Sequence, residues 1–291
     1  MKIELVSKKL ESVKTDALVF PLFEEEKKFS GNLEKINNIL DGAVSHLFKS
    51  QKFKAGENNF LVVPTFGKIK ADYVIVAGLG SKKKFELDVL RRLSAYTVRK
   101  LKSIKASDCI IDLDLELEDV DLKEAVQSIT EGAILGDYSF DKYFTKKEDF
   151  KVESVQINVS KKADKDVLKK YVEIGKVLAE AQNFTRDLVN EPANVINTVQ
   201  FAEIAENLAK QYGFEIKIYD EEEIEKMGMG AYLAVAKGSE NPPRFIHLTY
   251  RPKKSEGEIA IVGKGLMFDS GGLNIKTGDF MRWMKTDKSG A

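Results

Sequence analysis

The chain has 291 residues, enough for two domains of ordinary size. Lysine plus arginine and aspartate plus glutamate both number 46, so the net charge gives no sign of a polyanionic partner such as nucleic acid. One cysteine and two histidines exclude a disulfide framework, a multi-cysteine metal site and an HExxH zinc site. The apolar runs are too short to span a bilayer and the first residues do not resemble a secretory signal, so a cytoplasmic protein without membrane contact is expected.

The first 160 residues contain short β-rich runs that alternate with longer helix-like stretches. The runs are Asp16 to Leu22, Phe60 to Thr65, Tyr73 to Ala77 and Asp108 to Leu113, and the helix-like stretches surround Phe85 to Ser103 and Val120 to Leu135. This alternation predicts an α/β domain with a mostly parallel sheet. Phe150 to Val159 alternates apolar and polar residues, as a half-buried closing or edge strand would. The charged stretch Lys161 to Asp166 is the expected domain boundary.

Helical spacing of apolar residues begins at Asp164 and continues until Asn190, Glu191 and Pro192 interrupt it, which predicts one long helix. A second helix is expected from a cap at Thr198 to Gly213. The remaining expected elements are a strand at Phe214 to Tyr219, a short acidic helix that starts with a capping box at Asp220 and Glu223, and strands at Arg244 to Tyr250 and Glu258 to Val262.

The last expected strand runs directly into Gly263, Lys264 and Gly265, which would place Lys264 at the carboxyl end of a sheet strand. Ligands of α/β sheets bind at that edge. Asp269, Lys276 and Asp287 follow within a few turns of chain. Spacing alone does not separate a ligand site from an ordinary loop, because lysines and aspartates beside glycines are common in loops.

Metal chemistry in this segment would have to use carboxylates and amines. Two neighbouring divalent ions need bridging carboxylates, for which Asp269 and Asp287 are the candidates. A lysine ligates only as the neutral amine, which nearby dications favour, so Lys264 is a candidate ligand. Lys276, if it stays charged, is placed to stabilise a negative oxygen that forms on a substrate carbonyl.

The segment VGKGLMFDSGGLNIK resembles a motif of the leucyl aminopeptidase (cytosol aminopeptidase) family, in which a lysine is followed five positions later by aspartate and twelve positions later by lysine. Asp287 falls in a matching methionine-lysine-x-aspartate context. The resemblance extends through Gly228 to Tyr250 and Thr185 to Thr198, in the family's order. It therefore covers the chain well from Thr185 onward, and loosely before that residue.

The resemblance implies an amino-terminal α/β (macro-like) domain at residues 1–160, followed at 161–291 by an incomplete α/β catalytic domain with a central mixed sheet. It implies that Lys264, Asp269 and Asp287 ligate metal, with Asp269 bridging two ions, that Lys276 is catalytic, and that Met284 lines the pocket for the first substrate side chain. The implied cofactors are two divalent cations, Mn²⁺ or Zn²⁺ first and Mg²⁺ or Co²⁺ as alternatives. The implied activity is removal of amino-terminal leucine and other bulky apolar residues from peptides, by a homo-oligomer that is a hexamer in the complete family member.

In the family, a later motif of asparagine-threonine-aspartate-alanine-glutamate-glycine-arginine supplies two more metal carboxylates, and this sequence ends at Ala291, before that motif. The 291-residue chain is therefore expected to be inactive alone. The alternative is a non-catalytic binding or interaction module, DNA-binding for example, which the balanced charge disfavours. A salt-dependent shift of duplex DNA would favour this alternative, whereas cation uptake would favour the peptidase site.

Overall fold

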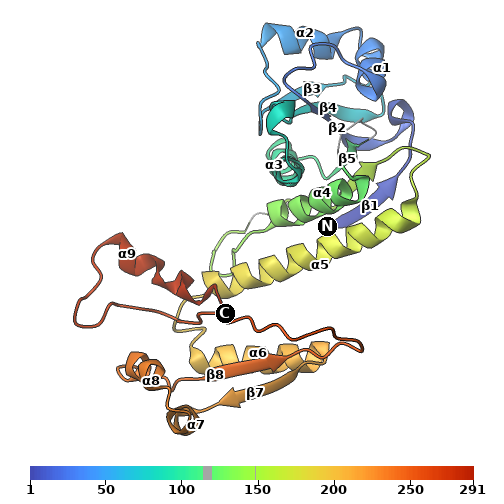
Figure 1. Ribbon diagram of the computed structural model, residues 1–291. Helices are drawn as coiled ribbons and strands as arrows, with labels where there is room; N and C mark the ends of the chain where they lie inside the picture. Colours follow the sequence, from blue (N-terminus) through green and yellow to red (C-terminus); the bar gives the residue numbers. More distant parts are fainter. Residues whose placement is uncertain (114–119, 148) are drawn as a thin grey trace. The chain divides into compact units, whose positions relative to one another are not determined.

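The computed structural model describes residues 1–113, 120–147 and 149–291 (Figure 1). The described chain divides into two compact units, Met1–Asn183 and Phe184–Ala291. The predicted long helix is confirmed as α5 (Lys165–Asn190), which crosses this division. The domain boundary expected after residue 160 would lie just before α5, and it stays a prediction. None of the helices in these ranges combines the length and the apolar character that crossing a membrane requires.

Within its described residues, the first unit is built on a six-stranded sheet in the order β1-β6-β5-β2-β4-β3. The strands are β1 (Lys2–Val6), β2 (Thr15–Leu22), β3 (Phe60–Pro64), β4 (Ala71–Gly78), β5 (Asp108–Asp112) and β6 (Ser154–Asn158). Neighbouring strands are parallel, apart from β3, which is antiparallel to β4. The α/β class and the mostly parallel sheet predicted for the amino-terminal domain are therefore confirmed.

Helices cover both faces of this sheet (Figure 1). Residues of α1 (Gly31–Ile39) and α2 (Ala43–Ser50) share one hydrophobic cluster with the sheet, and residues of α3 (Leu87–Ile104), α4 (Leu122–Asp137) and α5 share the other. Along β2, Leu18 and Phe20 enter the first cluster and Ala17 and Val19 the second, because successive side chains of a strand point to opposite faces. A continuous apolar run is thus buried on both sides.

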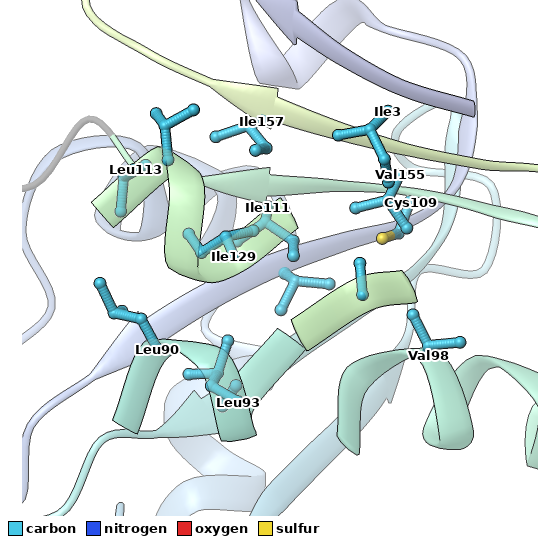
Figure 2. Packing of buried hydrophobic residues seen from close by; sticks show 14 of the residues in the cluster. Ile3, Leu90, Leu93, Val98, Cys109, Ile111, Leu113, Ile129, Val155 and Ile157 are labelled. Atoms are coloured by element: carbon cyan, nitrogen blue, oxygen red, sulfur yellow. The ribbon is translucent and has the colours of Figure 1, made fainter. Parts of the chain in front are cut away.

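Figure 2 shows the second cluster, where Leu90, Leu93 and Val98 of α3 lie across from sheet residues that include Ile111 and Cys109. Cys109 is fully buried, as expected for a small core residue. Burial raises the pKa of its thiol above the usual value, so this side chain stays a neutral packing group.

Two glycines allow α3 and α4 to pack closely. A Cβ built on Gly132 would lie 1.9 Å from the Arg91 carbonyl oxygen, and one built on Gly136 would lie 2.4 Å from that of Ala95. The Ser94 hydroxyl donates to the Ile129 carbonyl at 2.8 Å across the same interface. Glycine has a low helix propensity, but only a residue without a side chain allows the backbones of the two helices to approach this closely.

Gly132→Ala is expected to lower the free energy of unfolding of the first unit by about 1–3 kcal/mol, because α3 must shift to admit the methyl group. Helix propensity alone predicts a gain of about 1 kcal/mol, so the sign of the change separates the two effects. Urea denaturation followed by circular dichroism measures it. Gly230→Ala is the control, since a Cβ there meets no atom within 4 Å; a stabilised Gly132→Ala variant would contradict the close packing.

The second unit combines helices with a small antiparallel sheet, in which β7 pairs with β8 (Figure 1). Its elements after α5 are α6 (Thr198–Tyr212), β7 (Glu215–Tyr219), α7 (Glu221–Lys226), α8 (Gly230–Ala236), β8 (Phe245–Thr249) and α9 (Asp279–Arg282). The end of α6 at Gly213, in the left-handed conformation, is confirmed. So is the capping box between Asp220 and Glu223.

The cap predicted at Thr198 is wrong by one residue. Asn197 is the N-cap of α6, and its side-chain oxygen accepts hydrogen bonds from the backbone N–H groups of Val199 and Gln200. The Thr198 hydroxyl instead donates to the Pro242 carbonyl at 2.8 Å. Asparagine and threonine are both good caps, so composition alone could not choose between neighbours.

Two strand predictions are also corrected. The strand expected at the sheet edge, β6, is internal, because β1 pairs with its outer side. Glu258 to Val262 forms no strand: its backbone is irregular, and Ile259, Ile261 and Val262 are each more than nine-tenths exposed. A strand needs a neighbour to receive its backbone hydrogen bonds, and among the described residues of this unit β7 and β8 pair with each other.

Candidate functional site

The five predicted site residues lie in the second unit, on the segment that follows β8. Lys264 and Asp269 are in irregular backbone, so the expectation that Lys264 ends a sheet strand is wrong. Lys276 lies in the loop before α9, and Met284 and Asp287 lie in a short 3-10 helix, η3 (Trp283–Lys288). Their side chains form two groups, Asp269 with Lys276 and Met284, and Lys264 with Asp287.

Lys276 is the centre of the first group. Its Nζ forms an ion pair with Asp269 Oδ2 and also donates to Met284 Sδ at 2.9 Å. The other carboxylate oxygen, Asp269 Oδ1, accepts from the Gly271 backbone N–H at 2.8 Å. The hydrogen bond from Lys276, followed by that from Gly271, holds the pKa of Asp269 below its usual value although burial opposes this. Asp269 is thus an ionised carboxylate with a fixed orientation.

A tight turn at Gly271 brings Lys276 back to Asp269. Gly271 has a φ of 91°, and a Cβ there would lie 2.3 Å from the Asn274 carbonyl oxygen. The Lys276 backbone N–H closes the turn by donating to the Ser270 carbonyl at 2.8 Å. Only glycine fits this conformation and this contact, which explains the residue type that follows Asp269 and Ser270.

The second group depends on close approach of two backbone segments. Lys264 Nζ lies 3.4 Å from Asp287 Oδ1. Beside this pair, a Cβ built on Gly263 would lie 2.1 Å from the Gly290 carbonyl oxygen, and one built on Gly290 would lie 3.3 Å from the Lys264 carbonyl oxygen. The glycines at 263 and 290 therefore let the chain before Lys264 lie directly against the chain after Asp287.

The donor chemistry of these residues fits a divalent cation. Two carboxylates and one amine are ligands that Mn²⁺, Zn²⁺, Mg²⁺ and Co²⁺ accept. The lysines balance both carboxylate charges, and Lys264 lies close enough to Asp269 to contribute to its lowered pKa. No three His, Cys, Asp or Glu side chains gather into a possible ion site anywhere in the described ranges. The ligands present are consequently fewer than two ions need. The predicted roles of the five site residues stay predictions: Lys264, Asp269, Lys276, Met284 and Asp287.

The sequence analysis gave no role to Lys285, the lysine of the methionine-lysine-x-aspartate context, and did not mention Lys288. Their ammonium groups donate to the backbone carbonyls of Asn190 and Glu191. A lysine-rich stretch ordinarily indicates solvated surface, so residue type held no signal for these contacts.

Solved structures share this fold. The chain superposes on a variant of tomato leucine aminopeptidase with a TM-score of 0.85 at 24% identity, covering all of this chain and 57% of that one. It also matches the bottromycin maturation enzyme BotP with a TM-score of 0.73 at 27% identity, covering 95% of this chain and 53% of the enzyme. A second structure of BotP, with a TM-score of 0.72, is a complex with Mn.

Relatives found by sequence comparison have a higher sequence identity to this chain than these solved structures have. The chain is 71% identical to a probable cytosol aminopeptidase of a Sulfurihydrogenibium species and 53% identical to that of Persephonella marina. In both cases all of this chain is covered, and it spans 58% and 59% of the respective relative. Residues 19–147 match the N-terminal domain model of the cytosol aminopeptidase family, and residues 183–291 match the family's catalytic domain model. The chain therefore belongs to the cytosol aminopeptidase family, and corresponds to the amino-terminal portion of its members.

Proposed function

We propose that this chain provides part of the active site of a metal-dependent aminopeptidase that removes amino-terminal leucine and other bulky apolar residues from peptides. The observation that carries the proposal is the pairing of Lys264 with Asp287 and of Asp269 with Lys276, at the spacing of the family motif. Two lysines and two carboxylates from a segment of 24 residues are thereby joined in two ion pairs.

Lys264, Asp269 and Asp287 would hold two divalent cations. Mn²⁺ and Zn²⁺ are the first candidates, and the Mn complex of the similar enzyme BotP supports the former. When bound, the cations would fix the free amino group of the peptide and acidify a water molecule for hydrolysis. Lys264 would contribute its neutral amine, and the Gly271 N–H keeps one oxygen of Asp269 in place.

Lys276 would act on the substrate carbonyl. Its ammonium group is held between Asp269 and the Met284 sulfur, and an ammonium at this position stabilises negative charge as it develops on the carbonyl oxygen. Met284 offers a polarisable apolar surface next to that charge, which suits a leucine side chain better than a charged one. Catalytic and specificity residues would thus be neighbours, so that binding the first side chain aligns the scissile carbonyl.

We further propose a cytoplasmic homo-oligomer, a hexamer in the complete protein, that acts on peptides. Membership of a family named for the cytosol supports the cytoplasmic location. The homo-oligomer is inferred from the resemblance of the sequence motifs to that family.

Calorimetric titration of the 291-residue protein with MnCl₂ tests the proposal. Saturable uptake is expected, because two carboxylates of one segment are each already held beside a lysine amine. The same preparation is expected to leave leucyl-p-nitroanilide intact, since the described residues supply fewer carboxylates than two ions require. No uptake would contradict the cation site, and robust Mn²⁺-dependent turnover would contradict the expected inactivity.

A further inference from the structure

Lys288 is a charged side chain in a buried position. The residue is 2% exposed, and its Nζ donates to the Glu191 backbone carbonyl at 3.0 Å. Burial lowers the pKa of Lys288, the nearby charge of Lys285 lowers it further, and Glu191 opposes the change. Burying a lysine is unfavourable unless its ammonium group gains partners, so the contact with residue 191 is a specific one.

Lys285 makes the corresponding contact one turn earlier. Its Nζ donates to the Asn190 carbonyl at 3.1 Å. Asn190 is the last residue of α5, where the backbone carbonyls carry the negative end of the helix dipole. Two ammonium groups therefore bind neighbouring carbonyls at the carboxyl end of one helix. We name this pair, Lys285 and Lys288, the lysine clamp.

The geometry of η3 links the clamp to the site. A 3-10 helix has three residues per turn, so side chains three positions apart lie on the same face. Lys285 and Lys288 share one face, and Met284 and Asp287 share another. Fixing the first face on the end of α5 consequently fixes the rotation of η3, and with it the direction of Met284 toward Lys276 and of Asp287 toward Lys264.

We propose that Lys285 and Lys288 are positioning residues, which dock η3 on the end of α5 and thereby orient Asp287 and Met284. The orienting role rests on the proposed function of the site, whereas the docking does not. Neither clamp residue is among the predicted ligands or the catalytic lysine.

Lys288→Met and Lys285→Met test the clamp, the second being the milder change because Lys285 is only partly buried. Hydrogen exchange of the amides in η3, followed by mass spectrometry, is expected to become about tenfold faster or more in each variant. Mn²⁺ affinity is expected to fall by roughly 10- to 100-fold, the usual effect of losing support behind a ligand. Lys285→Arg keeps the charge and the donors, and is expected to restore both.

Lys226→Met is the matched control, since Lys226 lies in the same unit with a side chain 76% exposed, and neither quantity should change. Unaltered exchange in both methionine variants would overturn the docking. Faster exchange with unaltered Mn²⁺ affinity would overturn the orienting role. If the unsubstituted chain takes up no Mn²⁺, the proposed function fails, and hydrogen exchange alone then supports or refutes the clamp.

Discussion

Asp269→Asn is expected to weaken Mn²⁺ binding by roughly 100-fold or more, the largest loss for any single substitution in this segment. Asp269 is one of the carboxylates proposed to hold the cations, and asparagine removes its charge while keeping its size. The substitution also removes the ionic partner of Lys276, which leaves an uncompensated ammonium group beside the site. Both effects act against a cation, because one removes a ligand and the other adds unbalanced positive charge.

Asp279→Asn is the matched control, because Asp279 lies on α9 in the same segment, with a side chain 85% exposed and 3.9 Å from Arg282. Its Mn²⁺ affinity should equal that of the unsubstituted chain in calorimetric titration. Equal losses in the two variants would mean that uptake follows overall charge rather than this carboxylate. Circular dichroism of both variants checks that the fold is retained.

Local signals in the sequence predicted much of the fold. The long apolar runs of β2, β4 and β5 identify strands that are buried on both faces of a sheet, because such strands need no polar side. The helical spacing that ends near Asn190 identified α5. The capping box at Asp220 and Glu223 depends on four consecutive residues, so no distant contact was needed to find it.

Elements whose character depends on distant neighbours were missed or misassigned. Lys2–Val6 was not predicted as β1, since its short run contains two charged residues and is stabilised by pairing with β6, some 150 residues later. That same pairing makes β6 internal. Glu258 to Val262 has the composition of a buried strand, yet composition does not provide the neighbour that a strand requires.

The residue types of the candidate site could be predicted, and their pairings could not. A lysine, an aspartate and their spacing are visible in the sequence. Which lysine meets which carboxylate depends on the turn at Gly271 and on the backbone contact of Gly263 with Gly290. Burial of Lys288 was unforeseeable for the same reason, because its partner lies almost 100 residues earlier in the chain.

Gly263→Ala is expected to separate Lys264 from Asp287 and to weaken Mn²⁺ binding by about tenfold or more. A methyl group at this position would lie 2.1 Å from the Gly290 carbonyl oxygen, a contact that only a backbone shift relieves. Replacing glycine by alanine ordinarily stabilises a chain by about 0.4–1 kcal/mol through the unfolded state. Overpacking costs about 1–3 kcal/mol, so the second unit should lose stability.

Gly257→Ala separates these effects, because a Cβ there meets no atom within 4 Å and the residue lies in the same irregular segment. This control should bind Mn²⁺ like the unsubstituted chain and unfold at an equal or slightly higher urea concentration. Gly263→Ala should unfold earlier and bind more weakly. Because Gly263 ligates nothing, a weaker affinity in that variant alone would show that approach of the two backbone segments sets the distance between Lys264 and Asp287. Retained affinity would mean that the pair forms without this contact.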